Sequence, residues 1–148
     1  MASYKLESFT VKFQVEEQKR ACYNLRSSED VARWSSGIYQ DLDVNKEHFT
    51  VFFLNNKNRV IAHKVVSTGS LTASLVHPRE VFTGVLEYGA AALIFVHNHP
   101  SGDPAPSPED IEITRRLKQC AEIFGVRVLD HVVIGDGRNY SFSDRGIL

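Results

Sequence analysis

Hydrophobic and polar residues along this 148-residue chain follow two periods, one typical of strands and one typical of helices. Strict alternation over residues 9–15 predicts a half-buried strand near the N-terminus. Apolar runs predict further strands at residues 49–54, 60–66, 90–96 and 126–134, and a last short strand at 140–142. The polar stretch from Asn55 to Asn58 has the composition of a turn, so the first two of these strands are expected to form a hairpin.

Three segments between the strands carry apolar residues at helical spacing. The first helix is expected to begin after Ser28 as N-cap, the second at Pro78, and the third after Ser107. Gly89 and Gly125 are the expected ends of the second and third helices. The apolar stripes that we expect to be buried are Val31, Trp34, Ile38 and Leu42; Val81, Phe82, Val85 and Leu86; and Ile113, Leu117, Ala121 and Phe124.

Strands that alternate with helices, together with one early hairpin, predict an α/β fold in which helices flank a mixed sheet. The chain is long enough to bury one proper core, and we therefore expect a single domain. We place this domain at residues 26–148 and treat residues 1–25 as an N-terminal extension that contains the predicted first strand.

Composition narrows the classes of partner. A net charge of −1 gives no general attraction to nucleic acid or to an anionic membrane. Arg115, Arg116 and Lys118 form a modest basic cluster, which we interpret as a solvated helix face. Two distant cysteines indicate reduced thiols and a cytoplasmic protein rather than a disulfide framework. No apolar stretch approaches the ~20 residues of a membrane span, and no signal-peptide pattern is expected at the N-terminus.

The chemistry is concentrated in residues 97–110. His97 and His99 close the apolar run 90–96, and because strand side chains alternate, both imidazoles are expected on the same face. A loop rich in proline and glycine follows, and Ser107 and Asp110 then open a helix. A bare His-x-His pair is weak evidence, but the added Ser-x-x-Asp at this spacing is much more specific. We predict a metal site formed by His97, His99 and Asp110.

A simpler interpretation is that both histidines are hydrogen-bonded core residues, while Ser107 and Asp110 form a capping box. That interpretation explains the helix start but leaves two imidazoles at the end of a buried strand without partners. Asp103, in the loop between two prolines, is the rival third ligand, although a helix start would hold a ligand more firmly. Two imidazoles and one carboxylate suit zinc with an open position for a hydrolytic water.

Hydrolysis also needs a carboxylate outside the metal's ligands to move protons. Glu47 leads into the predicted strand 49–54, which a sheet could bring beside His97. Glu80 and Glu109 are rivals, but both fall in first helical turns, where acidic residues are common anyway. Asp130 and His131 lie in the strand 126–134, and they serve either behind the metal ligands or as hydrogen-bonded core residues.

These residues resemble a known family. The pattern His97-x-His99-Pro100-(x)6-Ser107-x-x-Asp110 is similar to the JAMM motif of the JAMM/MPN metallopeptidases, and the fuller His-Asn-His-Pro-Ser-Gly sequence resembles the RadC-like branch of bacterial proteins. The likeness extends over residues 45–148. It includes Glu47-x-Phe49, Pro78-Arg79-Glu80, Asp130-His131 and Tyr140-Ser141-Phe142-Ser143.

The resemblance implies a JAMM/MPN fold, related to the cytidine deaminase architecture, with one zinc ion held by His97, His99 and Asp110. It implies that Glu47 is the acid/base and that Ser107 donates a hydrogen bond to the developing oxyanion. JAMM enzymes cut peptide or isopeptide bonds, often beside ubiquitin-like partners. We therefore expect a zinc metallopeptidase-like hydrolase acting on a peptide or protein substrate.

Two other functions compete with hydrolysis. Longer RadC-like proteins carry a DNA-repair label and an N-terminal helical region that resembles DNA-binding modules. This chain has about 45 residues before the match and no such Gly-rich signature, so a DNA-binding accessory role is the weaker alternative. A nucleobase deaminase would need an H-x-E…P-C-x-x-C signature, which the sequence lacks.

Overall fold

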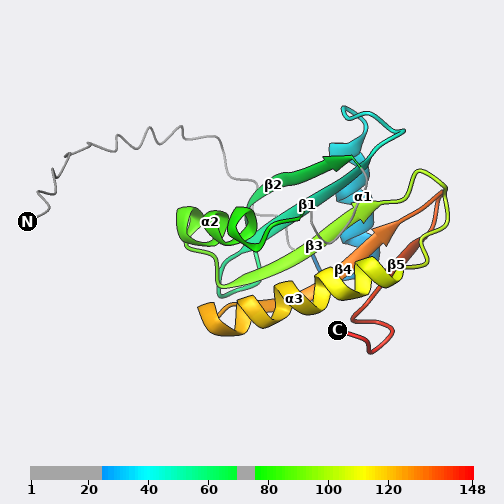
Figure 1. Ribbon diagram of the computed structural model, residues 1–148. Helices are drawn as coiled ribbons and strands as arrows, with labels where there is room; N and C mark the ends of the chain where they lie inside the picture. Colours follow the sequence, from blue (N-terminus) through cyan, green and yellow to red (C-terminus); the bar gives the residue numbers. More distant parts are fainter. Residues whose placement is uncertain (1–24, 70–75) are drawn as a thin grey trace, which may run out of the picture.

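The computed structural model describes residues 25–69 and 76–148 (Figure 1), and the strand predicted at residues 9–15 lies outside them. The helices of the described residues are α1 (Ser28–Tyr39), α2 (Pro78–Tyr88) and α3 (Pro108–Phe124). The strands are β1 (Glu47–Leu54), β2 (Val60–Gly69), β3 (Ala92–Asn98), β4 (Arg127–Ile134) and β5 (Asn139–Ser141).

The five strands form one mixed sheet in the order β2-β1-β3-β4-β5. β1 pairs antiparallel with both β2 and β3, β3 pairs parallel with β4, and β5 returns antiparallel along β4. The parallel pair needs a crossover, which α3 supplies between β3 and β4. This architecture confirms the predicted α/β domain with a mixed sheet between helices.

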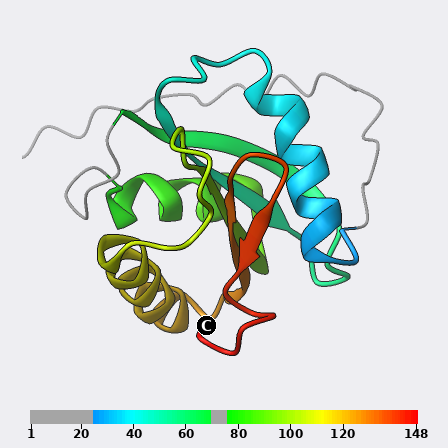
Figure 2. The same cartoon turned by 90° about the vertical axis from the view of Figure 1, so that its right-hand side faces the viewer.

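Helices cover both faces of the sheet: Figure 2 shows α1 on one side and α2 with α3 on the other. The alternation of strand side chains divides the core accordingly. On β1, Phe49, Val51 and Phe53 join the core under α2 and α3, whereas Phe52 and Leu54 join the core under α1. The odd-numbered residues of β3 share the first of these faces, which places His97 under α3 rather than under α1.

The helix boundaries agree closely with the sequence pattern, with one correction at the start of α1. Ser27, not Ser28, is the N-cap, and its hydroxyl accepts from the backbone N–H of Asp30. Trp34 packs against Phe52 with ring centroids 5.2 Å apart, which confirms its predicted place in the core. Among residues 25–69 and 76–148, no helix combines the length and apolar character that crossing a bilayer requires.

Two residues of the predicted stripes are exposed instead of buried. Leu86 is 73% exposed, because α2 approaches the sheet through Gly84 rather than through the Leu86 side. A Cβ added at Gly84 would overlap the ring of Phe53, so only glycine permits this approach. Phe124, 46% exposed, is the last residue of α3 and contacts the ring of Phe82 from the rim of the core.

Candidate metal centre

The end of β3 and the start of α3 bring three potential metal ligands together. His97 is the last fully buried residue of β3, His99 follows the strand, and Asp110 lies in the first turn of α3. The Nε2 atoms of the two histidines are 3.0 Å apart. Nε2 of His97 is 3.2 Å from Oδ1 of Asp110, and Nε2 of His99 is 3.2 Å from Oδ2 of Asp110. The three predicted ligand residues therefore converge, with their candidate ligand atoms all within 4.8 Å of one another.

Asp110 also helps to begin α3. Its Oδ2 accepts the backbone N–H of Ser107 at 2.7 Å, while the Ser107 hydroxyl accepts the backbone N–H of Asp110 at 3.1 Å. This reciprocal pair is a capping box, so the simpler interpretation of the Ser-x-x-Asp sequence is correct as far as it goes. The capping box and the convergence on the histidines coexist, because the Asp110 carboxylate has two oxygens with several lone pairs.

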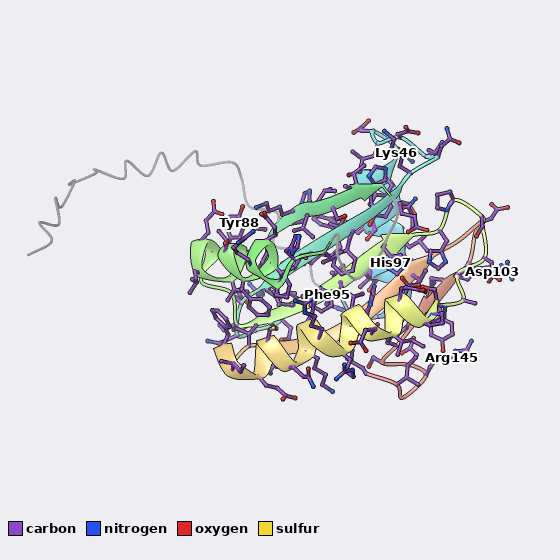
Figure 3. All side chains as sticks on the ribbon, in the orientation of Figure 1. Lys46, Tyr88, Phe95, His97, Asp103 and Arg145 are labelled. Carbon is purple, nitrogen blue, oxygen red and sulfur yellow. The ribbon has the colours of Figure 1, made fainter. Side chains whose placement is uncertain are left out.

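The loop after β3 fixes the orientation of His99. Its Nδ1 lies 2.7 Å from the carbonyl oxygen of Asp103, and a carbonyl can only accept, so Nδ1 carries the proton. When His99 is neutral, its lone pair is therefore on Nε2, the atom that takes part in the cluster. The carboxylate of Asp103 instead accepts the backbone N–H of Ala105, and this side chain is not part of the three-residue cluster. Asp103 thus acts through its backbone (Figure 3 labels it in the loop that follows β3).

A second row of side chains lies behind His97. Nδ1 of His97 is 2.8 Å from Nε2 of His131, and Nδ1 of His131 is 2.5 Å from the hydroxyl of Thr114. Asp130 does not join this row: its carboxylate accepts from Ser141 and from the backbone of Ser143 and His131. Sequence reasoning missed Thr114, although it lies four residues after Asp110 and hence on the same face of α3.

The charges in the cluster influence one another strongly. Burial alone would raise the pKa of Asp110, but its contacts with His97 and His99 outweigh burial and hold that pKa well below its usual range. The same contact with Asp110 raises the pKa of His99, against the opposing effect of burial. Burial lowers the pKa of His131 well below its ordinary value, so this imidazole is neutral.

This set of donors fits a metal cation. Two imidazole nitrogens and a carboxylate face one another in a nearly buried space, where a cation would pair with the buried carboxylate. Two nitrogen ligands and one oxygen ligand suit zinc, which is held by three protein ligands where a fourth position must stay open. The cluster could therefore bind a metal with room for one further ligand.

Strand register places Glu47 beside the cluster. Phe49 of β1 pairs with His97 of β3, and Glu47 lies two residues before Phe49 at the start of the same strand. The raised pKa of His99 has its largest cause in the contact with Asp110, followed by the hydrogen bond to the Asp103 carbonyl, and the negative charge of Glu47 adds to the effect. The rival Glu80 lies instead 3.9 Å from Lys64 on the surface.

A cavity of about 470 Å³ adjoins the cluster on the α1 side of the sheet. It runs between the end of α1 and the turn that joins β4 to β5, and of the three candidate ligands only His99 borders it. Tyr39, Val44 and Ile134 give it an apolar wall, and Asp136 lies at its rim.

Comparison with known proteins agrees with this geometry. A family model described as "RadC-like JAB domain" matches residues 25–147, which is most of the chain. The chain belongs to this family. The predicted resemblance to RadC-like proteins of the JAMM/MPN type is thereby confirmed, and the five-stranded mixed sheet with its three helices is consistent with the JAB/MPN fold.

Relatives of this RadC-like chain are known from several bacteria under the name UPF0758 protein. One from Pelobacter propionicus is 57% identical over 110 residues, which cover 74% of this chain and 48% of the relative. One from Bacillus cereus is 49% identical over 124 residues, which cover 84% of this chain and 54% of the relative. The chain thus spans about half the length of the curated relatives it matches.

Proposed function

We propose that this RadC-like domain is a zinc-dependent hydrolase that cleaves an amide bond in a peptide or isopeptide substrate. The observation that carries the proposal is the buried convergence of His97, His99 and Asp110, whose ligand atoms lie within 4.8 Å of one another. These three residues would hold the zinc ion. Once bound there, zinc would supply a water of lowered pKa and a Lewis acid for the substrate carbonyl.

Glu47 is the acid/base in this proposal. Attack of water forms the new C–O bond and breaks the C–N bond, and one proton must move from the water to the leaving nitrogen. Two observations support this role: Glu47 lies two residues before Phe49, which pairs with His97, and its charge acts on His99 although Glu47 is not one of the three clustered residues.

Ser107 stabilises the charge that builds on the substrate. Its hydroxyl oxygen accepts one hydrogen bond, from the backbone N–H of Asp110, so its own proton is still available for donation. A hydroxyl that is fixed at a helix start can donate to a carbonyl oxygen as it becomes an oxyanion. The start of α3 adds its positive dipole end to the same effect.

A peptide substrate fits the surroundings better than DNA does. The cavity beside His99 combines an apolar wall with polar groups, as a binding cleft for a chain requires. Arg115 of the modest basic cluster donates two hydrogen bonds of 3.1 and 2.6 Å to Glu112. That pairing offsets one of the three positive charges in the only basic cluster that the sequence suggested for nucleic acid.

Metal analysis combined with a cleavage assay tests the proposal. Wild-type protein should contain one zinc per chain and cleave members of a peptide library. His99→Ala should lose the metal, while Glu47→Gln should keep the metal and lose at least ~100-fold in rate. Glu109→Gln is the matched control, since Glu109 is an exposed glutamate beside Asp110 and its loss should leave both metal and rate unchanged.

Two results would contradict the proposal. Wild-type protein prepared without chelators that contains no zinc and takes none up would remove the metal centre. Zinc-loaded protein that cleaves no peptide or isopeptide but binds DNA in a salt-sensitive way would replace hydrolysis by an accessory role in DNA transactions.

A further inference from the structure

Three side chains from three different elements form one hydrogen-bonded row behind the candidate metal centre. Thr114 of α3, His131 of β4 and His97 of β3 are all buried, with exposed fractions of 4%, 0% and 0%. The Thr114 hydroxyl lies 2.6 Å from the carbonyl oxygen of Asp110, one turn earlier in the same helix. The row therefore begins at the backbone of one candidate ligand and ends at the imidazole of another.

The direction of every proton in this row follows from one fixed point. A carbonyl oxygen can only accept, so the single proton of the Thr114 hydroxyl is donated to Asp110. The hydroxyl must then accept from Nδ1 of His131. This ring is fully buried, and its two nitrogens contact Thr114 and His97, neither of which carries a carboxylate to hold a second proton, so Nε2 keeps its lone pair. That lone pair accepts from Nδ1 of His97, and Nε2 of His97 is left without a proton.

We propose that Thr114 and His131 are positioning residues that hold His97 in the tautomer whose Nε2 lone pair faces the metal. The inference rests on the proposed metal centre and adds two residues that orient one of its ligands. The two histidine ligands reach the same tautomer by different means, His99 through the backbone carbonyl of Asp103 and His97 through this row of side chains. A preset tautomer means that metal binding requires no proton rearrangement.

A purely structural role for these residues makes a different prediction. His131 packs against Phe142 with ring centroids 4.7 Å apart and against Phe49 at 5.4 Å, so its ring also fills the core. If packing were its only task, the hydroxyl of Thr114 would matter for stability but not for the proton on His97. The test must therefore separate the hydroxyl from the shape of the side chain.

Thr114→Val and Thr114→Ser provide that separation. Valine keeps the shape and loses the hydroxyl, whereas serine keeps the hydroxyl and loses a methyl group. Zinc affinity is measured by competition with a chromogenic chelator, and circular dichroism establishes that each variant is folded. Thr114→Val should bind zinc ~10- to 100-fold more weakly, and Thr114→Ser should stay within about threefold of wild type.

The tautomers themselves are read from the ¹⁵N chemical shifts of the imidazoles in the metal-free protein at alkaline pH. Wild type and Thr114→Ser should show His97 protonated at Nδ1, and Thr114→Val should show a mixture of tautomers. Equal zinc affinity and an unchanged His97 tautomer in Thr114→Val would overturn the inference while leaving the proposed function standing. Wild-type protein that binds no zinc would end the proposed function, and the tautomers would still decide whether the row orders its protons.

Discussion

Gly135 lies in the turn between β4 and β5 and packs closely against the loop that carries His99, and replacing it by alanine should disturb both the fold and the candidate metal centre. A Cβ at this position would overlap the carbonyl oxygen of Gly102 and would lie 2.8 Å from Cδ of Pro104 and 2.9 Å from the carbonyl carbon of Gly102. These are mostly backbone atoms, so no flexible side chain can swing aside. The φ angle of Gly135 lies outside the left-handed region, and the clash is therefore the main penalty.

The magnitude follows from the contacts that must give way. Relieving the clash requires the two backbones to separate by about 1 Å, and overpacking of this kind costs about 1–3 kcal/mol. The same movement stretches the 2.8 Å hydrogen bond from the N–H of Asp136 to the carbonyl of Gly102, and losing it costs about 1 kcal/mol more. We expect the Gly135→Ala variant to lose roughly 2–4 kcal/mol of unfolding free energy.

The same displacement of the loop should also weaken metal binding at the candidate metal centre. The loop holds His99 through the hydrogen bond from its backbone N–H to Ile134, at 2.8 Å, and through the carbonyl of Asp103 that orients the ring. Moving that carbonyl removes the group that fixes the tautomer of His99, and we expect zinc affinity to fall by about tenfold. Chelator competition measures this fall at temperatures where the variant is still folded.

Urea denaturation with a matched glycine provides the control. Gly37 lies on α1, and a methyl group added there would meet no atom within 4 Å, so Gly37→Ala should gain about 0.5–1 kcal/mol from helix propensity alone. A Gly135→Ala protein that unfolds at the wild-type urea concentration and binds zinc with wild-type affinity would refute this reasoning, because the close approach would then have no energetic weight.

Two further predictions concern single side chains. Asp130→Ala removes the acceptor of three hydrogen bonds, two of them buried and one partly buried, and should cost about 3–5 kcal/mol in urea unfolding. Asp130→Asn should cost clearly less, since burial raises the pKa of this carboxyl, and equal losses would contradict that. Burial lowers the pKa of His63 below its ordinary 6.5. The contribution of neutral His63 to the free energy of unfolding is therefore fully present above pH 6.5. It is lost as the pH falls through the lowered pKa, because the unfolded chain takes up the proton first. A His63→Gln variant should show a flatter dependence of stability on pH, and an NMR titration midpoint at or above 6.5 would contradict the assignment.

The convergence of the candidate ligands could be predicted from sequence because each step is local. Alternation along a strand places His97 and His99 on one side, and the helix start at Ser107 fixes where Asp110 projects. The loop between the strand end and the helix start had only to bring the histidines and Asp110 together, and because this loop is short it allows few arrangements. Glu47 was harder, since its place depends on the pairing of β1 with β3.

Two features that sequence reasoning missed depend on contacts between distant segments. The row behind His97 exists because the parallel register sets Phe95 of β3 beside His131 of β4, and neither strand encodes that pairing alone. The exposure of Leu86 likewise follows from a close approach of Gly84 to Phe53 on another element. Local periodicity predicts which face of a helix or strand is buried, whereas contacts between distant segments determine how the buried faces pack against one another.

Asp110 takes part both in the helix cap and in the candidate metal centre, and this affects how sequence changes among RadC-like chains should be interpreted. Its carboxylate completes the capping box of a 17-residue helix, so replacing it costs helix stability even in a chain that has abandoned metal chemistry. Selection for folding alone can therefore preserve this aspartate. His99, whose side chain contacts its own loop and the cluster, has no comparable duty in starting an element. Drift at His99, rather than at Asp110, is the change that would mark a lineage whose domain has become a scaffold.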